Sequence, residues 1–257
     1  MKRILLLSAL CFSAAIGHAQ DATGLLGEVF SAKRIVKTNL VGYAFLSVNA
    51  NYEQKTGPNT SVGLLAGYKL PSTIHVEAIG NLDGENQTYS GDVEPKGVFL
   101  NPYFRYYTAQ TFKGFYMEAF LRYFNYTYLV PYDYEKNNGT TIHANLDGTA
   151  SAFGGGLALG VQFNIAPRVY MDINAGFGVA TGNAHIETND PNLELEDYLT
   201  IKHNIEKYQD DADVQVFLLG DILKDPVAKA DANHAEADFN NKIFPIVRGG
   251  ICIGYAF

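Results

Sequence analysis

Residues 169–182 read VYMDINAGFGVATG, and apolar side chains occupy every second position over most of this stretch. The apolar set comprises Val169, Met171, Ile173, Ala175, Phe177 and Val179, and most residues between them are polar or small. A period of two matches a β-strand, because successive side chains of a strand point to opposite faces. The stretch therefore predicts a strand with one apolar face and one polar face.

The same alternation recurs along most of the chain. We expect eight strands, at residues 35–46, 48–56, 61–70, 97–109, 113–128, 151–165, 169–182 and 244–257. Strands of a soluble sandwich also have one apolar face, so the alternation alone leaves a sandwich and a barrel open.

The lengths of the connecting segments separate these two folds. The connectors after the second, fourth and sixth strands are short, at 57–60, 110–112 and 166–168, and those after the third, fifth and seventh are long, at 71–96, 129–150 and 183–243. The turn near Ser47, on the long-loop side, is an exception because it is short. Alternating short turns and long loops are typical of outer-membrane barrels. We therefore predict an all-β fold, an eight-stranded antiparallel up-and-down transmembrane β-barrel with a partly helical long extracellular loop.

The composition excludes several classes of protein. Apolar residues make up 47% of the 257 residues and charged residues only 18%, which allows one sizeable core and argues against disorder. A formal charge of −8 argues against a nucleic-acid partner, because phosphate binding needs a clustered basic face. Two cysteines are too few for a disulfide framework.

The start of the chain is typical of an exported protein. Two basic residues precede an apolar run at 4–16, and small residues stand at positions 17 and 19. This pattern predicts a signal peptide at 1–19, followed by a barrel domain at 20–257 with the long insertion 183–243. Cleavage before Cys11, as in a lipoprotein, is a weaker alternative. The expected location is the bacterial cell outer membrane.

Charged residues on the polar faces of the strands are candidates for a buried network. Eight strands enclose an interior just wide enough for side chains, so we expect a closed interior in which charges pair with one another. The candidates are Glu53, Lys69, Arg105, Glu118, Arg122, Asp172 and Arg248, with Lys37 and Lys55 as further inward residues. Glu118 and Arg122 share a face of one strand. A structural role is favoured, and a path for protons or ions is the alternative.

The three long loops are acidic. They hold 22 of the 27 acidic residues and 7 of the 19 basic ones. Ordinary solvated loops explain this charge, and the alternative is that their carboxylates hold divalent cations near anionic lipid head groups.

Local patterns predict structure within these loops. Asp190 and Pro191 precede apolar residues spaced by three and four, which predicts a helix at 191–208. Residues 214–223 fit either a helix or a strand. Asp-Gly pairs predict turns at 81–84 and 145–148.

All five histidines of the exported chain fall in the expected loops, at His75, His143, His185, His203 and His234. Three of them could approach above the barrel to bind a metal, or serve a hydrolase with Ser72 or Ser90. Solvated loop histidines are the favoured interpretation, so we predict no catalytic residue, no metal and no cofactor. Cys252 is expected to be a small buried residue.

Several short motifs, in order along the chain, carry a family resemblance. They are Asn39-Leu40, Asn51-Tyr52-Glu53 leading to Ser61-Val62-Gly63, Arg105-Tyr106-Tyr107, Lys113-Gly114-Phe115-Tyr116 and Gly254-Tyr255-Ala256-Phe257. Over 33–182 and 244–257 the chain resembles a family of small Bacteroidetes outer-membrane β-barrels of unknown function, broadly similar to eight-stranded barrels of the outer membrane protein A and X type. The resemblance implies fold and location, with no activity attached.

These observations together predict a function in the cell envelope. We expect a non-enzymatic barrel with a structural or surface-interaction role, whose partners are outer-membrane lipid and an envelope or cell-surface protein bound through loops 71–96 and 183–243. A lipid-modifying or proteolytic barrel enzyme and a secreted soluble lipid-binding barrel are the alternatives.

Overall fold

The computed structural model describes residues 32–257, except 83–84, 136–140 and 211–224. The predicted signal peptide at 1–19 and the ambiguous segment 214–223 lie outside the described residues. The side chains of 74–92 and 130–135, and those of His143 and 207–210, are also not described.

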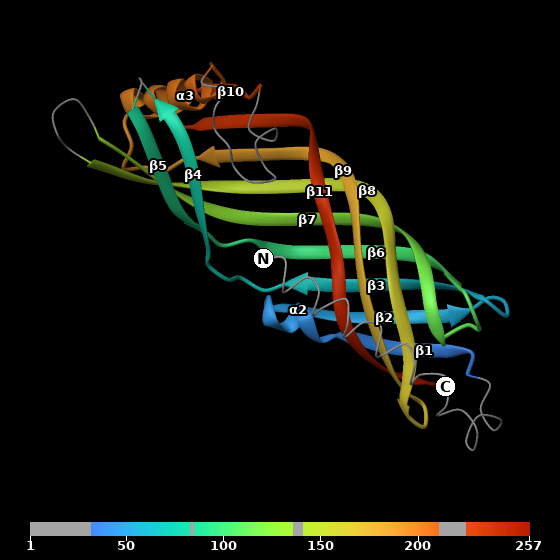
Figure 1. The fold of residues 1–257 in the computed structure, drawn as a ribbon. Helices are drawn as coiled ribbons and strands as arrows, with labels where there is room; N and C mark the ends of the chain where they lie inside the picture. Colours follow the sequence, from blue (N-terminus) through green and yellow to red (C-terminus); the bar gives the residue numbers. More distant parts are fainter. Residues whose placement is uncertain (1–31, 83–84, 136–140, 211–224) are drawn as a thin grey trace.

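Eight strands pair into a closed antiparallel ring (Figure 1). They are β1 (Arg34–Asn39), β2 (Ser47–Lys55), β3 (Thr60–Lys69), β6 (Lys96–Tyr107), β7 (Gly114–Glu135), β8 (Thr141–Ala166), β9 (Val169–Thr188) and β11 (Ala235–Ala256). Each strand pairs with the next in this order, and β11 closes on β1 with Ile35 opposite Ala256. The predicted all-β class, the antiparallel pairing and the eight strands of the ring are confirmed.

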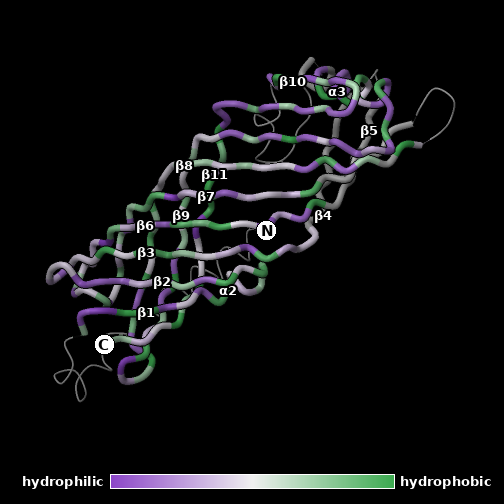
Figure 2. The backbone as a smooth tube through the Cα atoms, turned by 180° about the vertical axis from the view of Figure 1, so that it is seen from behind, coloured by the Kyte–Doolittle hydropathy of each residue, from purple (hydrophilic) through white to green (hydrophobic). Residues whose placement is uncertain are grey.

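The two faces of the ring differ in the way the alternation predicts. Along β6 every second side chain from Phe99 to Tyr107 is buried, and those between them are exposed. On the outside of the ring, Leu157 is 72% exposed and Val247 is 69% exposed. Figure 2 shows the alternation of hydrophobic and hydrophilic residues along the strands. The aliphatic rows therefore cover the outer surface of the ring rather than its interior.

The first expected strand ends earlier than its sequence suggests. A short helix, α2 (Leu40–Ala44), follows β1 directly. The side chain of Asn39 accepts a hydrogen bond from the backbone N–H of Val41 and so caps this helix. The expected strand 35–46 is therefore divided, and α2 forms the connection to β2.

The expected loop 129–150 is mostly strand. β7 and β8 continue as a paired ribbon up to Glu135 and Thr141, which lie opposite each other. The turn predicted at 145–148 is wrong, because these residues lie inside β8 and Leu146 is buried. The Asp-Gly pair there fits a strand because Gly148 faces the ring of Tyr128, where a larger residue would clash.

The expected loop 71–96 contains a hairpin that the alternation did not reveal. Its strands are β4 (Ile74–Leu82) and β5 (Glu85–Val93), which form a separate two-stranded sheet. Leu82 pairs with Glu85. The Asp83-Gly84 pair of the turn predicted at 81–84 lies outside the described residues.

Beyond the ring, four strands continue as an extension of the sheet. We define the extension as residues 128–135 of β7, 141–150 of β8, 183–188 of β9 and 235–240 of β11, together with β10 (Val227–Ala230), which pairs with β11. The expected loop 183–243 is therefore flanked by paired strands. In Figure 1 the extension lies at the opposite end of the molecule from the chain's C-terminus.

One helix, α3 (Leu195–Asp210), packs on the extension. The helix predicted at 191–208 is confirmed, but it starts four residues later than expected. Asp190 forms a turn with Leu193 instead of capping the helix, and the side chain of Asp197 accepts a hydrogen bond from the backbone N–H of Glu194. Neither helix in the described part of the chain has the length and apolar character needed to cross a membrane.

Candidate functional site: a buried charge cluster

Six charged side chains meet inside the ring, and we call them the charge cluster. They are Lys37 on β1, Glu53 on β2, Arg105 on β6, Glu118 on β7, Asp172 on β9 and Arg248 on β11. Each stands at an inward position of its strand because it follows the same two-residue period as the buried aromatic residues. Three positive and three negative groups make the cluster formally neutral.

Two cations share two carboxylates at the centre of the cluster. The Nζ atom of Lys37 lies 2.5 Å from Glu53 Oε2 and 2.6 Å from Asp172 Oδ2. The Nη1 atom of Arg105 lies 3.1 Å from the same Glu53 oxygen and 2.7 Å from the same Asp172 oxygen. All four side chains are 0% exposed. These short contacts are charge-assisted hydrogen bonds in a site shielded from water.

Arg105 joins this centre to a second group of charges. Its Nε atom lies 2.8 Å from Glu118 Oε2, and the Nε atom of Arg248 lies 2.5 Å from Glu118 Oε1. The Arg105 guanidinium also lies 4.0 Å from the centre of the Tyr116 ring. Arg105 therefore contacts all three carboxylates of the cluster, and we expect it to contribute most to its stability.

Neutral side chains complete the hydrogen bonding of two of the carboxylates, Glu53 and Asp172. Tyr107 donates its hydroxyl to Glu53 Oε1 over 2.6 Å, and Tyr116 donates to Asp172 Oδ1 over 2.5 Å. Gln162 Oε1 accepts hydrogen bonds from both Lys37 and Arg105. A buried ion pair is stable only when its remaining polar atoms find partners, so these residues belong to the cluster in physical terms.

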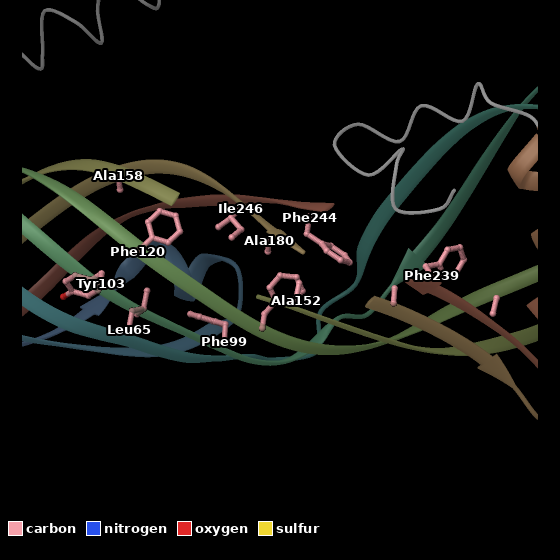
Figure 3. Close-up of a cluster of buried hydrophobic side chains, with 13 residues drawn as sticks. Leu65, Phe99, Tyr103, Phe120, Ala152, Ala158, Ala180, Phe239, Phe244 and Ile246 are labelled. Atoms are coloured by element: carbon pink, nitrogen blue, oxygen red, sulfur yellow. The ribbon is translucent and has the colours of Figure 1, made fainter. Parts of the chain in front are cut away.

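Two apolar layers lie on either side of the charges. On β7, successive inward residues are Tyr116, Glu118 and Phe120, and on β9 Tyr170 precedes Asp172. The layer at the short turns comprises Ile35, Tyr107, Phe112, Tyr116, Tyr170 and Ala256. The layer toward the extension includes Phe124 together with Leu65, Phe99, Phe120, Phe244 and Ile246, and the last five are labelled in Figure 3. The charges are thus enclosed by apolar side chains along the ring axis.

Of the seven residues expected in a network, the structure brings five together. As a correction to the expected network, Lys69 lies at the end of β3, where its Nζ atom donates to the backbone oxygen of Leu70 and to Ser72. Arg122 lies over the ring of Phe99 and donates to Tyr126 Oη, rather than pairing with Glu118.

Spacing along β7 explains why Glu118 does not pair with Arg122, and the register between β6 and β7 explains why it pairs with Arg105. Residues four apart on one strand are separated by roughly 13 Å, since each residue advances about 3.4 Å. Arg105, by contrast, stands directly opposite Glu118 in the pairing of β6 with β7. Tyr116 and Gln162 were not predicted for a related reason: the face on which each lies is visible in the sequence, but its cross-strand partners are not.

Two of the five histidines meet on the outer face of the extension. His234 Nε2 lies 3.3 Å and His185 Nε2 3.6 Å from Glu187 Oε2, and His185 Nδ1 lies 2.7 Å from Asp238 Oδ1. Burial lowers the pKa of His185, but its hydrogen bonds to the two carboxylates outweigh burial and raise it overall. His203 is exposed on α3. Within the described residues, no three metal-binding side chains are arranged to hold an ion.

Comparison with known proteins gives one match. No curated protein and no solved structure matches the chain. A family model described as "Protein of unknown function (DUF3575)" matches residues 9–202, which include β1 to β9 and the charge cluster except Arg248. The resemblance to a family of unknown function is confirmed at this level, while the Bacteroidetes origin and the likeness to outer membrane protein A remain predictions. The chain belongs to the DUF3575 family.

Proposed function

We propose that this protein is a non-enzymatic β-barrel of the bacterial outer membrane, with up-and-down strands, a closed interior, and a structural or docking role at the cell surface. The observation that carries the proposal is the change in the outward side chains along single strands. On β8 these are Leu159, Leu157 and Phe153 within the ring, and Thr149 and Asp147 beyond it. A boundary of this kind is expected where a strand leaves lipid for water.

The outward side chains of β9 and β11 change from apolar to polar at the same height as those of β8. On β9 the outward residues pass from Phe177 and Val179 to His185 and Glu187, and on β11 from Val247 and Ile243 to Asp238 and Glu236. Ser151, Asn183 and Asn241 mark the height at which the outward side chains change. Ser151 pairs with Asn183, and the Asn183 side chain accepts a hydrogen bond from the backbone N–H of Asn241. The outward side chains of three strands thus change from apolar to polar at one height. This supports a planar boundary, such as the surface of a bilayer.

The apolar belt has suitable dimensions for a bilayer. On β7 the outward belt runs from Phe115 to Tyr123, which is nine residues, and a tilted transmembrane strand needs about 9–11. Exposed tyrosines stand at both margins of the belt, as in the aromatic girdles of outer-membrane barrels. Tyr52, Tyr106 and Tyr255 lie toward the short turns, and Tyr68 and Tyr123 lie toward the extension.

The polar interior favours this proposal over a secreted lipid-binding barrel. A soluble barrel that carries lipid has apolar side chains inside, whereas the interior here holds the charge cluster and the aliphatic rows face out. The buried charge cluster fits a structural role because the carboxylates are engaged by cations and hydroxyls. We therefore assign no reaction to it.

Membrane fractionation combined with heat modification tests the proposal. We expect the protein in the outer-membrane fraction of its cells, soluble only with detergent, and migrating faster on unboiled than on boiled electrophoresis samples because the ring resists detergent. A surface protease should cleave within 183–243 and leave the ring protected. Monodisperse protein in plain buffer, without detergent, would refute a membrane location.

A further inference from the structure

The end of the ring that carries the short turns is basic. Its cations are Lys33, Arg34, Lys55, Lys113 and Arg168. The described acidic residues of the same strand segments, Glu53, Glu118 and Asp172, all face the interior and are buried. This face therefore presents positive charge to its surroundings, opposite in sign to the acidic extension.

Two of these arginines flank the seam where the ring closes. Arg34 and Phe257 exchange backbone hydrogen bonds of 3.1 and 2.9 Å, so their side chains stand side by side on the outer surface. Across the next strands, Arg168 donates through Nη1 to Tyr255 Oη over 3.1 Å, and its backbone oxygen accepts from the N–H of Ala256. The two guanidinium groups thus lie on either side of Tyr255 and Phe257.

Neighbouring side chains orient the guanidinium of Arg34. Its Nε atom donates to Gln54 Oε1 over 3.0 Å, and the Gln54 amide nitrogen donates to the backbone oxygen of Lys33. Tyr52 donates its hydroxyl to the same Gln54 oxygen. An arginine held in this way loses less freedom when it binds a ligand than a mobile surface lysine does.

We propose that Arg34 and Arg168 bind the phosphate of an anionic phospholipid in the leaflet at the short-turn end, an inference that rests on the proposed membrane location. The planar fork of arginine suits phosphate oxygens. The exposed row formed by Val36, Tyr255 and Ile253 continues from this point along the belt, where the acyl chains of the lipid pack. This adjoining apolar row is the reason to choose a lipid over a soluble phosphate compound.

Lipid binding by reconstituted protein tests the proposal. The full exported chain is placed in nanodiscs of phosphatidylcholine with a minor fraction of phosphatidylglycerol, and co-purifying phosphatidylglycerol is measured by native mass spectrometry. One cation near an anionic surface changes affinity about fivefold. The affinity of the double variant Arg34→Gln/Arg168→Gln for phosphatidylglycerol should therefore fall roughly thirtyfold. The matched control Lys69→Gln/Lys229→Gln, with the same charge change near the other end, should bind as the wild type does.

Each other outcome has a defined meaning. Equal phosphatidylglycerol binding by wild type and the arginine double variant overturns the proposal, as does an equal loss in the lysine control, which would reflect net charge alone. Displacement of the lipid by inorganic phosphate overturns the choice of a lipid. The variant Arg34→Lys, which keeps the charge without the fork, should bind less than wild type and more than Arg34→Gln. Insertion into phosphatidylcholine without any lipid preference refutes this inference alone, whereas failure to insert at all refutes the proposed function.

Discussion

The ring and the extension are parts of the same strands, yet their outer faces differ, and only the ring encloses a cluster of charges. In the ring, the charge cluster lies inside and aliphatic residues such as Leu157 lie outside. In the extension, the inner face is apolar, because Leu146 and Ala144 pack against Tyr198 and Ile201 of α3, and the outer face is polar. Both parts therefore bury apolar side chains on the inner face, but the ring also buries the charge cluster there and exposes aliphatic residues on its outer face.

The pairing of β8 with β9 does not change where the ring meets the extension, whereas β11 has a bulge between Phe239 and Lys242 at this level. Hydrogen-bonded pairing of β8 with β9 runs without a shift from Asp147 opposite Glu187 to Asn164 opposite Tyr170. On β8 and β9 only the outward side chains change, near Ser151. Uninterrupted pairing of β8 with β9 is therefore compatible with an aliphatic outer face in the ring and a polar outer face in the extension. Each of the three predictions below tests one side of this comparison.

The largest effect is expected from Arg105→Met, which removes the cation that contacts all three carboxylates of the charge cluster. Breaking a buried ion pair typically costs about 3–5 kcal/mol, because a charge is left without compensation. We expect a loss of stability of that size in urea unfolding of the detergent-solubilised protein.

The matched control for Arg105 lies in the extension. Lys202 on α3 lies 3.3 Å from Glu206, and both side chains are partly exposed. Lys202→Met should cost at most about 0.5 kcal/mol, since exposed pairs on one helix contribute little. If the two variants lost equal stability, the charge cluster would not be shielded from water in the way the structure indicates.

An intermediate effect is expected when one charge is placed on the outside of β8 at two levels. Leu157→Lys puts an ammonium group in the apolar belt, and Thr149→Lys puts one on the same face in the extension. A lysine facing lipid near the middle of the bilayer costs about 2–4 kcal/mol, falling toward zero near the interface. Unfolding from lipid vesicles measures both costs, and equal costs at the two positions would argue against a lipid boundary near Ser151.

The amino-acid sequence predicts the strands of the ring but not those of the extension. The two-residue period identified all eight strands of the ring because each has one apolar face. For residues 129–150 the sequence predicts a loop, since the Asp147-Gly148 pair resembles a turn, whereas β7 and β8 extend through this region. The apolar surface that covers them belongs to α3, which is distant in sequence, so local patterns could not reveal the pairing.

The charge cluster was predictable in part for a similar reason. Inward charges such as Arg105 and Asp172 follow from the period of their own strands. Which charges meet depends on the register between strands, as the pairing of Glu118 with Arg105 rather than Arg122 shows. The register is a property of paired strands and cannot be read from either strand by itself.

The smallest effect concerns pH and the outer face of the extension. The pKa of His185 is raised above its ordinary value of about 6.5, because its hydrogen bonds to Asp238 and Glu187 outweigh the cost of burial. A raised folded-state pKa means that the folded protein binds the proton more tightly than the unfolded chain. The resulting stability is fully present below the ordinary pKa and is lost as the pH rises through the raised one.

We therefore expect Asp238→Asn to destabilise the protein more at about pH 6 than at an alkaline pH above the raised pKa, where His185 is neutral in both the folded and the unfolded chain. The difference should be at most about 1 kcal/mol, since His185 is 31% and Asp238 37% exposed and water screens the pair. Urea unfolding of wild type and variant at both pH values measures it. If Asp238→Asn cost the same stability at both pH values, Asp238 would not stabilise the protonated form of His185. The polar face of the extension would then interact with solvent alone.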